Sequence, residues 1–341
     1  MSDKDDQPDG KRSWPIHHWI TIGAVTAWFV GSIIRWTVRD AWPATSAIFY
    51  ALPVPVLIAS GCLTLLSLQK RLKAAKEQRP RIRAIVNSVL IGVLLLQLLV
   101  WLPNAYYRST SDSGDSETWR FMFWNTYHGE LGEVDIAKEL ADSNCDLIAL
   151  VEAPDRATTP EVWQRHLPEH TAYRLGSQMT ILARKQDLPI KVIEVVNGNL
   201  PASIRYRIVK LLRGEHVFRI IVIDINSNPF RFRRREFQRL AELAREFESA
   251  PLILAGDFNT PVDSVYSELL RNARLSNAFD DCGVGYRPTW PVYFPMLTLD
   301  QVWTNSSVSC RSCWREASWN SDHRRVVVEF EFSPETQMDR N

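Results

Sequence analysis

Residues 251–259 read PLILAGDFN, an apolar run that ends abruptly in polar residues. A short apolar run of this kind is typical of a buried β-strand. Asp257 and Asn259 follow directly, and an Asp or Asn that closes a single strand is usually a turn residue. This stretch decides the fold because the same arrangement returns at several other places in the chain.

Polar side chains also mark the ends of four further strand-like runs. Asn125 ends FMFWN, Glu152 ends LIALVE and Asp300 ends LTLD, while Asp322 and His323 precede RRVVVEFEF. Each residue alone would be unremarkable. Together, polar ends on so many core-like strands predict that these side chains converge on one cleft.

The order of elements favours an α/β fold. Short strands alternate with amphipathic helices from about residue 118, and no internal repeat is visible. The expected strands cover 119–125, 145–153, 180–183, 191–196, 218–226, 251–259, 299–303 and 324–332, and the expected helices cover 131–142, 230–248 and 263–273. Many strands with few helices between them indicate two packed mixed β-sheets flanked by helices rather than a doubly wound sheet.

The N-terminal third has a different composition. After a polar tail at 1–13, three apolar segments near 17–36, 44–68 and 84–103 each reach or approach the length of a membrane-spanning helix. We therefore predict a membrane anchor at 14–108 with three transmembrane helices, the second kinked by Pro53 and Pro55. A buried helical hairpin in a soluble protein is the alternative, but Trp and Tyr near the segment ends favour the membrane.

Charge predicts how the anchor is oriented. The segment between the second and third apolar runs is strongly basic, with Lys70, Arg71, Lys73, Lys76, Arg79, Arg81 and Arg83. By the positive-inside rule this loop is cytoplasmic, so the N-terminus is cytoplasmic and everything after residue 104 is extracytoplasmic, periplasmic in a bacterium. Arg35 and Arg39 are a mild objection to this orientation, because they put basic charge in the first loop, which it makes extracytoplasmic. A linker at 109–117 follows, and residues 334–341 form a C-terminal tail.

Overall charge and cysteine content narrow the function only slightly. Lys and Arg number 40 against 39 for Asp and Glu, so no basic excess argues for nucleic-acid binding. Cys310 and Cys313 have the spacing of zinc or redox motifs, but no second ligand pair at similar spacing is apparent. We interpret them as structural thiols or as part of a disulfide, which an extracytoplasmic location would favour.

These motifs resemble those of a known superfamily. Asn125, LIALVE, GDFN at 256–259, LDQVW at 299–303 and SDH at 321–323 look like the endonuclease/exonuclease/phosphatase superfamily, which includes DNase I-like nucleases, inositol-polyphosphate phosphatases and neutral sphingomyelinases. They occur in family order within residues 118–333, and the resemblance implies a four-layer α/β sandwich there. RPTWP at 287–291 and the anchored N-terminal part are similar to membrane-anchored bacterial members.

The resemblance implies a divalent metal ion. Glu152 would be the main ligand, Asn125 would support the ligand shell, and Asp322 would be a second ligand or would position a water. Mg²⁺ fits these oxygen donors because it is a hard cation that keeps several waters, and Mn²⁺ is the alternative.

The resemblance also implies catalytic roles. Asp257 would orient or deprotonate the attacking water. Asn259, expected on the same strand face two residues on, would hydrogen-bond the phosphate or the nucleophile. His323 would contact a phosphate oxygen, and Asp300 would hold its far ring nitrogen and favour the charged imidazolium.

One position departs from the family pattern. FRIIVIDIN aligns with a strand that usually ends in a phosphate-binding His, and Asp224 stands at that position here. An ionised Asp cannot donate to phosphate. Three readings follow: Asp224 binds a second metal, Asn226 or Asn228 supplies the missing donor, or catalysis is weakened.

The predicted function is that of a membrane-anchored, divalent-metal-dependent hydrolase of phosphodiesters or phosphomonoesters. The expected partners are the lipid bilayer and a phosphate-ester substrate, which is nucleic acid, phospholipid or a small phosphate ester; no protein partner is predicted. A nuclease acting on extracytoplasmic DNA or RNA is the first alternative, and a catalytically weakened scaffold or receptor is the second. Trp290 and Tyr293 are expected to stack on a base, to touch acyl chains or simply to pack.

Overall fold

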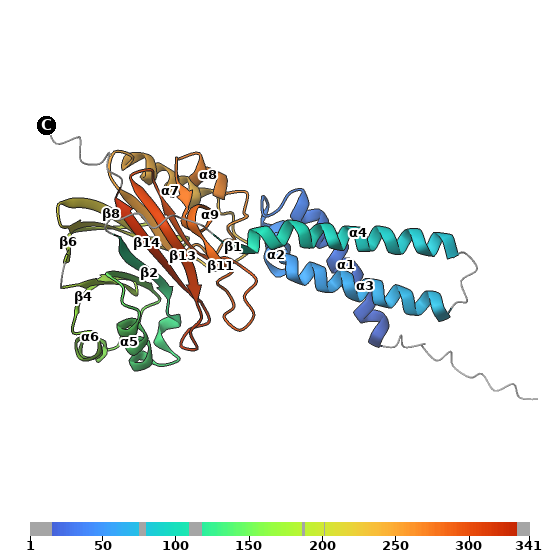
Figure 1. The fold of residues 1–341 in the computed structure, drawn as a ribbon, viewed down its shortest axis with the longest axis horizontal. Helices are drawn as coiled ribbons and strands as arrows, with labels where there is room; N and C mark the ends of the chain where they lie inside the picture. Colours follow the sequence, from blue (N-terminus) through green and yellow to red (C-terminus); the bar gives the residue numbers. More distant parts are fainter. Residues whose placement is uncertain (1–15, 75–79, 109–117, 186–187, 201, 333–341) are drawn as a thin grey trace, which may run out of the picture.

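The computed structural model describes residues 16–74, 80–108, 118–185, 188–200 and 202–332. A β-rich body and a group of N-terminal helices lie end to end (Figure 1). The predicted tails at 1–13 and 334–341, the linker at 109–117, and Lys76 and Arg79 of the basic loop lie outside the described residues.

Two six-stranded sheets form the body. The first has the order β10-β12-β9-β8-β7-β6, with bounds Ser276–Asn277, Asp300–Thr304, Leu252–Asp257, His216–Ile225, Ile204–Arg213 and Ile190–Leu200. The second has the order β13-β14-β2-β3-β5-β4, with bounds Val308–Glu316, Arg325–Phe332, Trp119–Asn125, Leu147–Val151, Met179–Arg184 and His170–Gly176. Both sheets are mixed, because β8 runs parallel to β9 and β2 parallel to β3 among otherwise antiparallel pairs.

The two sheets pack face to face over one apolar core. Successive side chains of a strand point to opposite faces, and Phe121, Phe123, Val222 and Ala255 are among those that meet between the sheets. Helices cover the outer faces: α7 (Arg234–Glu246) and α8 (Ser267–Arg271) pack on the first sheet, and α5 (Glu133–Asp142) and α6 (Thr159–His166) on the second. The predicted pair of packed mixed sheets with flanking helices is confirmed.

Smaller elements connect the body to the helices. Strands β1 (Tyr106–Arg108) and β11 (Val284–Tyr286) pair at the junction, while η1 (Tyr127–Gly129) and α9 (Ala278–Cys282) follow β2 and β10.

Cys282 forms a disulfide with Cys310, whereas Cys313 is a buried free thiol. The CxxC pair is therefore not one site: one member belongs to a disulfide and the other packs in the core.

The prediction of three clear membrane-spanning helices is corrected by the structure, which describes four N-terminal helices. They are α1 (Ile16–Trp36), α2 (Pro43–Ala51), α3 (Val54–Ala74) and α4 (Pro80–Ala105). Two, at residues 18–36 and 80–105, are long and apolar enough to cross a membrane by themselves. The expected single helix at 44–68 is broken before Val54, where α2 and α3 meet at 72°, so they count as a third span only as a bent pair. Pro53 lies at the break, where an interior helical hydrogen bond would have been lost.

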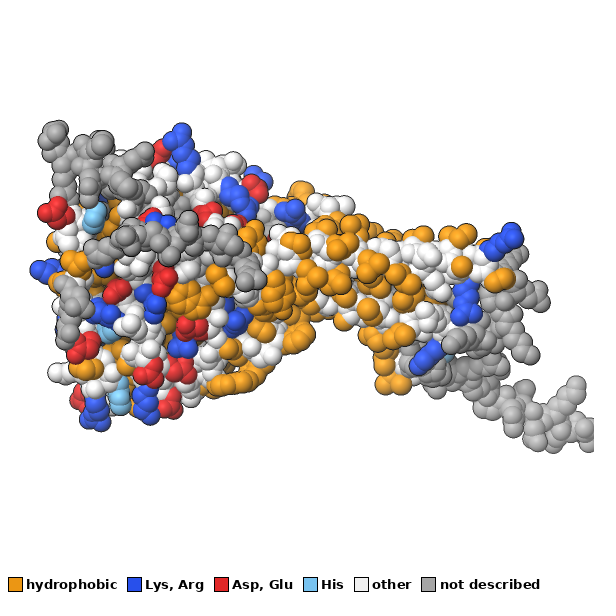
Figure 2. Space-filling model, in the orientation of Figure 1, with side chains coloured by type: hydrophobic (Ala, Val, Ile, Leu, Met, Phe, Trp, Pro, Cys, Tyr) orange, Lys and Arg blue, Asp and Glu red, His pale blue; other side chains and the backbone are white. Residues whose placement is uncertain are grey.

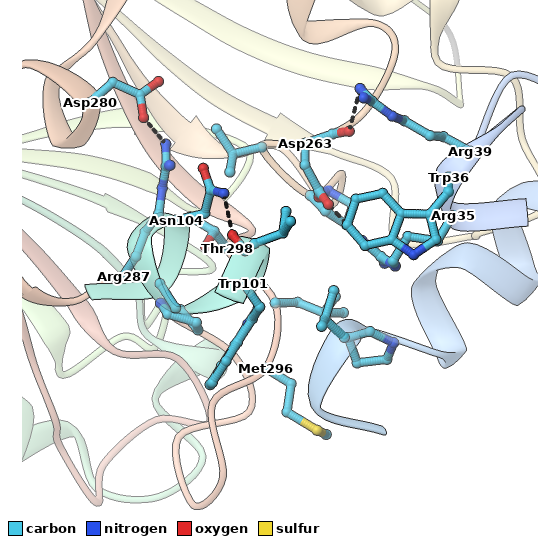
Figure 3. Close-up of a pocket in the computed structure, with 18 of the residues that line it drawn as sticks. Arg35, Trp36, Arg39, Trp101, Asn104, Asp263, Asp280, Arg287, Met296 and Thr298 are labelled. Carbon is cyan, nitrogen blue, oxygen red and sulfur yellow. Dashed lines mark hydrogen bonds and ion pairs between the residues drawn. The ribbon is translucent and has the colours of Figure 1, made fainter. Parts of the chain in front are cut away.

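Segment 37–51 lies against the β-rich body rather than extending away from it. Asp40 is fully buried, and its carboxylate accepts hydrogen bonds from Ser264 Oγ at 2.6 Å and Val265 N at 3.0 Å. Arg35, only 5% exposed, forms an ion pair with Asp263 at 2.5 Å. These contacts fix the end of α1 and the turn before α2 to the loop after β9, beside a cavity of about 410 Å³ at the junction (Figure 3).

Candidate active site

A layer of polar side chains lies at one edge of the sandwich, directly beyond the apolar core. Phe123, Val222 and Ala255 face inward, so the next inward positions on the same strands are those of Asn125, Asp224 and Asp257. Pairing on neighbouring strands sets Asp257 opposite both Asp224 and Asp300. Strand alternation therefore brings residues more than 170 positions apart into one cluster.

A cavity of about 440 Å³ opens at this layer. Six residues predicted from the sequence line it: Asn125, Glu152, Asp257, Asn259, Asp322 and His323. Asp300 lies beneath it, fully buried and in contact with His323. Asp224, Asn226 and Asn228 do not line this cavity; the first two line a smaller neighbouring one.

His323 is held between carboxylates. Its Nδ1 lies 2.8 Å from Asp300 Oδ2, and its Nε2 lies 3.9 Å from Asp257 Oδ2. Burial by itself would lower the pKa of His323, but the negative charges of Asp300 and Asp257 outweigh it and raise that pKa to about 10. The imidazole is therefore a cation at neutral pH, with both ring nitrogens carrying protons that point toward oxygen atoms.

Asp257 is the most confined carboxylate of the cluster. Its Oδ2 accepts hydrogen bonds from Asn125 Nδ2 at 3.0 Å and from Asn259 Nδ2 at 3.1 Å. Burial raises the pKa of Asp257 to about 7, with Asp300 adding to the rise and His323 opposing it. A carboxylate with this pKa exchanges a proton near neutral pH, as a general base requires.

Asn259 reaches Asp257 by a different route from the one expected. Strand β9 ends at Asp257, and Asn259 has a φ of 44°, so the extended backbone assumed from the sequence does not continue. The side chain instead turns back, donating to Ile225 O at 2.8 Å as well as to Asp257. Asn adopts this left-handed conformation more readily than most residues, and the two side-chain hydrogen bonds hold Asn259 in it.

Glu152 and Asp322 both line the cavity and carry carboxylate oxygens that could bind a cation. Glu152 has a φ of 46°, a turn directly after β3, and its Oε2 lies 3.3 Å from His128 Nε2. Asp322 Oδ2 accepts a hydrogen bond from Trp290 Nε1, while the buried Oδ1 has no hydrogen-bond partner among the described residues. This oxygen lies 3.8 Å from His323 Nε2. A buried carboxylate oxygen without a hydrogen bond, in a cavity with other oxygen donors, suits a hard divalent cation.

A second grouping could also hold a metal by distance alone. Asp257, Asp300 and His323 offer ligand atoms within 4.8 Å of one another. A metal-bound imidazole must be neutral at the ligating nitrogen, whereas the two carboxylates hold His323 in its charged form. A cation bound by this trio would therefore have to displace a proton from His323, whereas the oxygen donors of Glu152 and Asp322 would bind one without that cost.

Asp224 has a partner that the sequence did not suggest. It is 4% exposed and forms an ion pair with Arg205 on the adjacent strand β7. Burial raises the pKa of Asp224 to about 6, Arg205 opposes this, and Glu152 adds to it. Asn226 and Asn228 use their side-chain oxygens to accept the backbone N–H groups of Asn228 and Phe230, which shapes the loop after β8.

Several residues near the cavity were missed by sequence reasoning. Arg205 lies on a strand that was not recognised, because IRYRIVKLLR mixes basic and apolar residues. His128 follows Asn125 closely and could have been noted for its proximity to a predicted ligand. The least expected lining residues come from the N-terminal helices: Ala47, Tyr50 and Ala51 of α2 form part of the cavity wall.

Comparisons with known proteins give the same picture of the fold. The sequence matches a model of the Endonuclease/Exonuclease/phosphatase family over residues 122–323. An endonuclease/exonuclease/phosphatase from Bacteroides vulgatus is a similar solved structure, with 14% identity, a TM-score of 0.52, and alignment over 64% of this chain and 100% of the other.

Two further solved structures are similar at 15% identity and a TM-score of 0.50. They are a mannosyl-6-phosphatase of Bacteroides thetaiotaomicron VPI-5482, aligned over 63% of this chain and 100% of the other, and a humanized TDP2 of D. rerio, aligned over 63% and 99%. At this identity the likeness shows the fold alone. No curated protein matches the sequence.

Proposed function

Because the chain belongs to the Endonuclease/Exonuclease/phosphatase family, we propose that it is a membrane-anchored, divalent-metal-dependent phosphoesterase that hydrolyses a phosphodiester or phosphomonoester. One observation carries the proposal: at the cavity, the buried His323 ring contacts Asp300 through one nitrogen and Asp257 through the other. A purely structural core has no need for a cation flanked by two buried carboxylates, whose desolvation is costly.

In the proposed reaction a water oxygen bonds to phosphorus while the bond from phosphorus to the leaving alcohol breaks. Asp257 takes a proton from the water, and the leaving oxygen takes up a proton from solvent. An alcohol is released together with a phosphomonoester (from a diester) or phosphate (from a monoester), without a covalent intermediate. His323 donates from Nε2 to a phosphate oxygen and stabilises the negative charge that accumulates there. Asn259 orients the water or the phosphate from beside Asp257.

The oxygen donors of Glu152, Asn125 and Asp322 would hold Mg²⁺, with Mn²⁺ as the alternative. The ion would offset the charge on the phosphate oxygens and help to align the ester. Arg205 compensates for the missing histidine in part, because its guanidinium neutralises Asp224 and so limits the repulsion of an incoming phosphate.

We also propose the membrane topology. Helices α1 and α4 cross the bilayer, and α3 makes the third passage after the chain bends sharply at the end of α2, which leaves the N-terminus cytoplasmic and the catalytic domain at 118–333 extracytoplasmic. The ion pair of Arg35 with Asp263 weakens the objection raised by basic charge in the first loop. The Cys282–Cys310 disulfide suits an oxidising compartment.

A substrate screen on the full-length protein in lipid nanodiscs tests the proposal. The panel contains plasmid DNA, RNA, phospholipids and small phosphate esters, each with Mg²⁺ or Mn²⁺. We expect hydrolysis that Asp257→Ala and His323→Ala abolish and that exposed Asp142→Ala retains. Activity that survives both site substitutions would refute the site, and inactivity on every substrate would favour the scaffold.

A further inference from the structure

We infer that the substrate is a phosphate ester carried by a membrane lipid, and that its lipid portion lies against helix α2 of the anchor. This inference rests on the proposed function and names the substrate class of the same cavity. Its evidence is the composition and position of the cavity wall.

The cavity has apolar as well as polar lining residues. Beside the carboxylates and His323, its lining includes Ala47 and Ala51 of α2 together with Pro229, Leu297 and Leu299. Ala47 and Ala51 are four residues apart, so they share one face of the helix. Small side chains on that face leave a smooth apolar surface beside the phosphate position, which suits a hydrocarbon chain better than the polar surface of a nucleotide or sugar.

Helix α2 is a fixed part of the wall. Phe49 and Ser46 are buried, and Tyr50 donates a hydrogen bond to Asp40 Oδ2 at 3.2 Å. Asp40 in turn accepts from Ser264 and Val265 of the catalytic body. The anchor therefore contributes structure to the cavity, and does more than hold the catalytic body near a surface.

The same helix marks the level of the bilayer surface. It begins seven residues after the last residue of α1, Trp36, and it continues into α3 at Val54. Figure 1 shows α2 where the sandwich meets the helices, and Figure 2 shows apolar side chains gathered there. In the proposed topology the end of α1 at Trp36 marks the bilayer surface, which places the cavity near the level of the lipid phosphate groups.

Exposed aromatic side chains beside the cavity point to the same surface. Tyr293, Phe294 and Trp319 are 67–71% exposed, and the rings of Tyr293 and Trp319 lie 5.1 Å apart. Val292 N donates to Asp322 O at 2.7 Å, which ties this aromatic loop to the site. Clustered exposed aromatics that flank a cavity at a membrane boundary favour insertion into the lipid interface.

The test compares each lipid ester with its own water-soluble headgroup. The full-length protein in phosphatidylcholine nanodiscs is supplied with phosphatidic acid against glycerol 3-phosphate, with phosphatidylglycerol against glycerophosphoglycerol, and with an oligonucleotide. Hydrolysis of the phosphatidylcholine itself is followed as a further lipid ester, against glycerophosphocholine. We expect kcat/KM to be at least about tenfold higher for a lipid ester than for its headgroup, the effect of burying roughly two methylene groups.

Two variants test which part of the protein produces this preference for the lipid ester: Ala51 in the cavity lining, or the exposed aromatic side chain of Trp319. Ala51→Glu adds a charge to the apolar wall and should lower the lipid-to-headgroup ratio of kcat/KM about tenfold. Trp319→Ser should raise KM for the lipid more than KM for the headgroup. Ala44→Glu is the matched control: it places the same charge at an exposed position of α2 outside the cavity lining, and the ratio should not change.

The outcomes separate this inference from the proposed function. Equal or better hydrolysis of the headgroups or the oligonucleotide would overturn the lipid inference and leave the phosphoesterase intact. A ratio that is the same in wild type and Ala51→Glu would overturn the role of α2. If the protein hydrolyses none of the lipid esters, headgroups or oligonucleotide, the proposed function is overturned, and the lipid inference with it.

Discussion

Replacing Asp300 by asparagine should move the alkaline limit of activity toward neutral pH. The asparagine keeps the shape of the side chain and can still accept from His323 Nδ1, but it removes a buried negative charge at 2.8 Å from the ring. With about 4 Å between the centres of two delocalised charges and an effective dielectric constant of about 20, that charge contributes about 4 kcal/mol, or about three pKa units. The pKa of His323, raised to about 10 in the native protein, should fall to about 7 in the variant.

The assay is the pH dependence of kcat/KM between pH 6 and 11. The imidazolium is the active form, so activity falls as pH rises through the pKa of His323. At pH 8 a pKa of about 7 leaves roughly a tenth of the imidazole protonated, so Asp300→Asn should lose about tenfold there and much less at pH 6. Exposed Asp142→Asn is the control. An alkaline limb that stays near pH 10 in Asp300→Asn would refute the role given to this carboxylate.

Three further predictions concern other parts of the molecule. In the wild type, kcat/KM should rise as pH increases through about 7, where Asp257 ionises; Asp257→Asn should lose at least about a thousandfold in kcat, and a loss below tenfold would contradict its role as base. Arg205→Gln leaves Asp224 without its cation and should raise KM several-fold, with recovery in the double variant Arg205→Gln/Asp224→Asn; no recovery would show that the two residues act separately. Cys282→Ser opens a disulfide that spans 28 residues and should lower the free energy of unfolding by about 3 kcal/mol in chemical denaturation, whereas an unchanged transition would mean that the native protein holds this pair reduced.

The sequence was most informative where strand periodicity and strand ends coincide. A polar residue one step beyond an inward-facing apolar position must lie at the mouth of the sandwich, which is why Asn125 and Asp257 could be placed before the fold was known. The contact between Asp300 and His323 was likewise anticipated from the resemblance. Hydrophobic periodicity reports the inward face of each strand, and these side chains lie on that face.

Other features depend on contacts that periodicity does not encode. Arg205 lies on a strand whose charged residues hid its alternation, and its pairing with Asp224 follows from the register of β7 with β8. Asn259 approaches Asp257 through a left-handed backbone, which a strand pattern cannot predict. The break at Pro53 was expected to be a kink within one helix. Pro53 breaks the helix locally, and the contacts of Asp40, just before α2, hold this segment on the β-rich body, a tertiary arrangement that the sequence pattern does not encode.

The central claim is that this cluster carries out metal-dependent hydrolysis. The most direct measurement is the rate of ester hydrolysis by the full-length protein after metal removal with EDTA and titration with Mg²⁺, in the wild type and in Asp257→Asn. We predict no turnover after EDTA, saturable recovery with Mg²⁺ in the wild type, and no recovery in the variant. Wild-type turnover that persists in EDTA, or equal recovery in Asp257→Asn, would contradict the account.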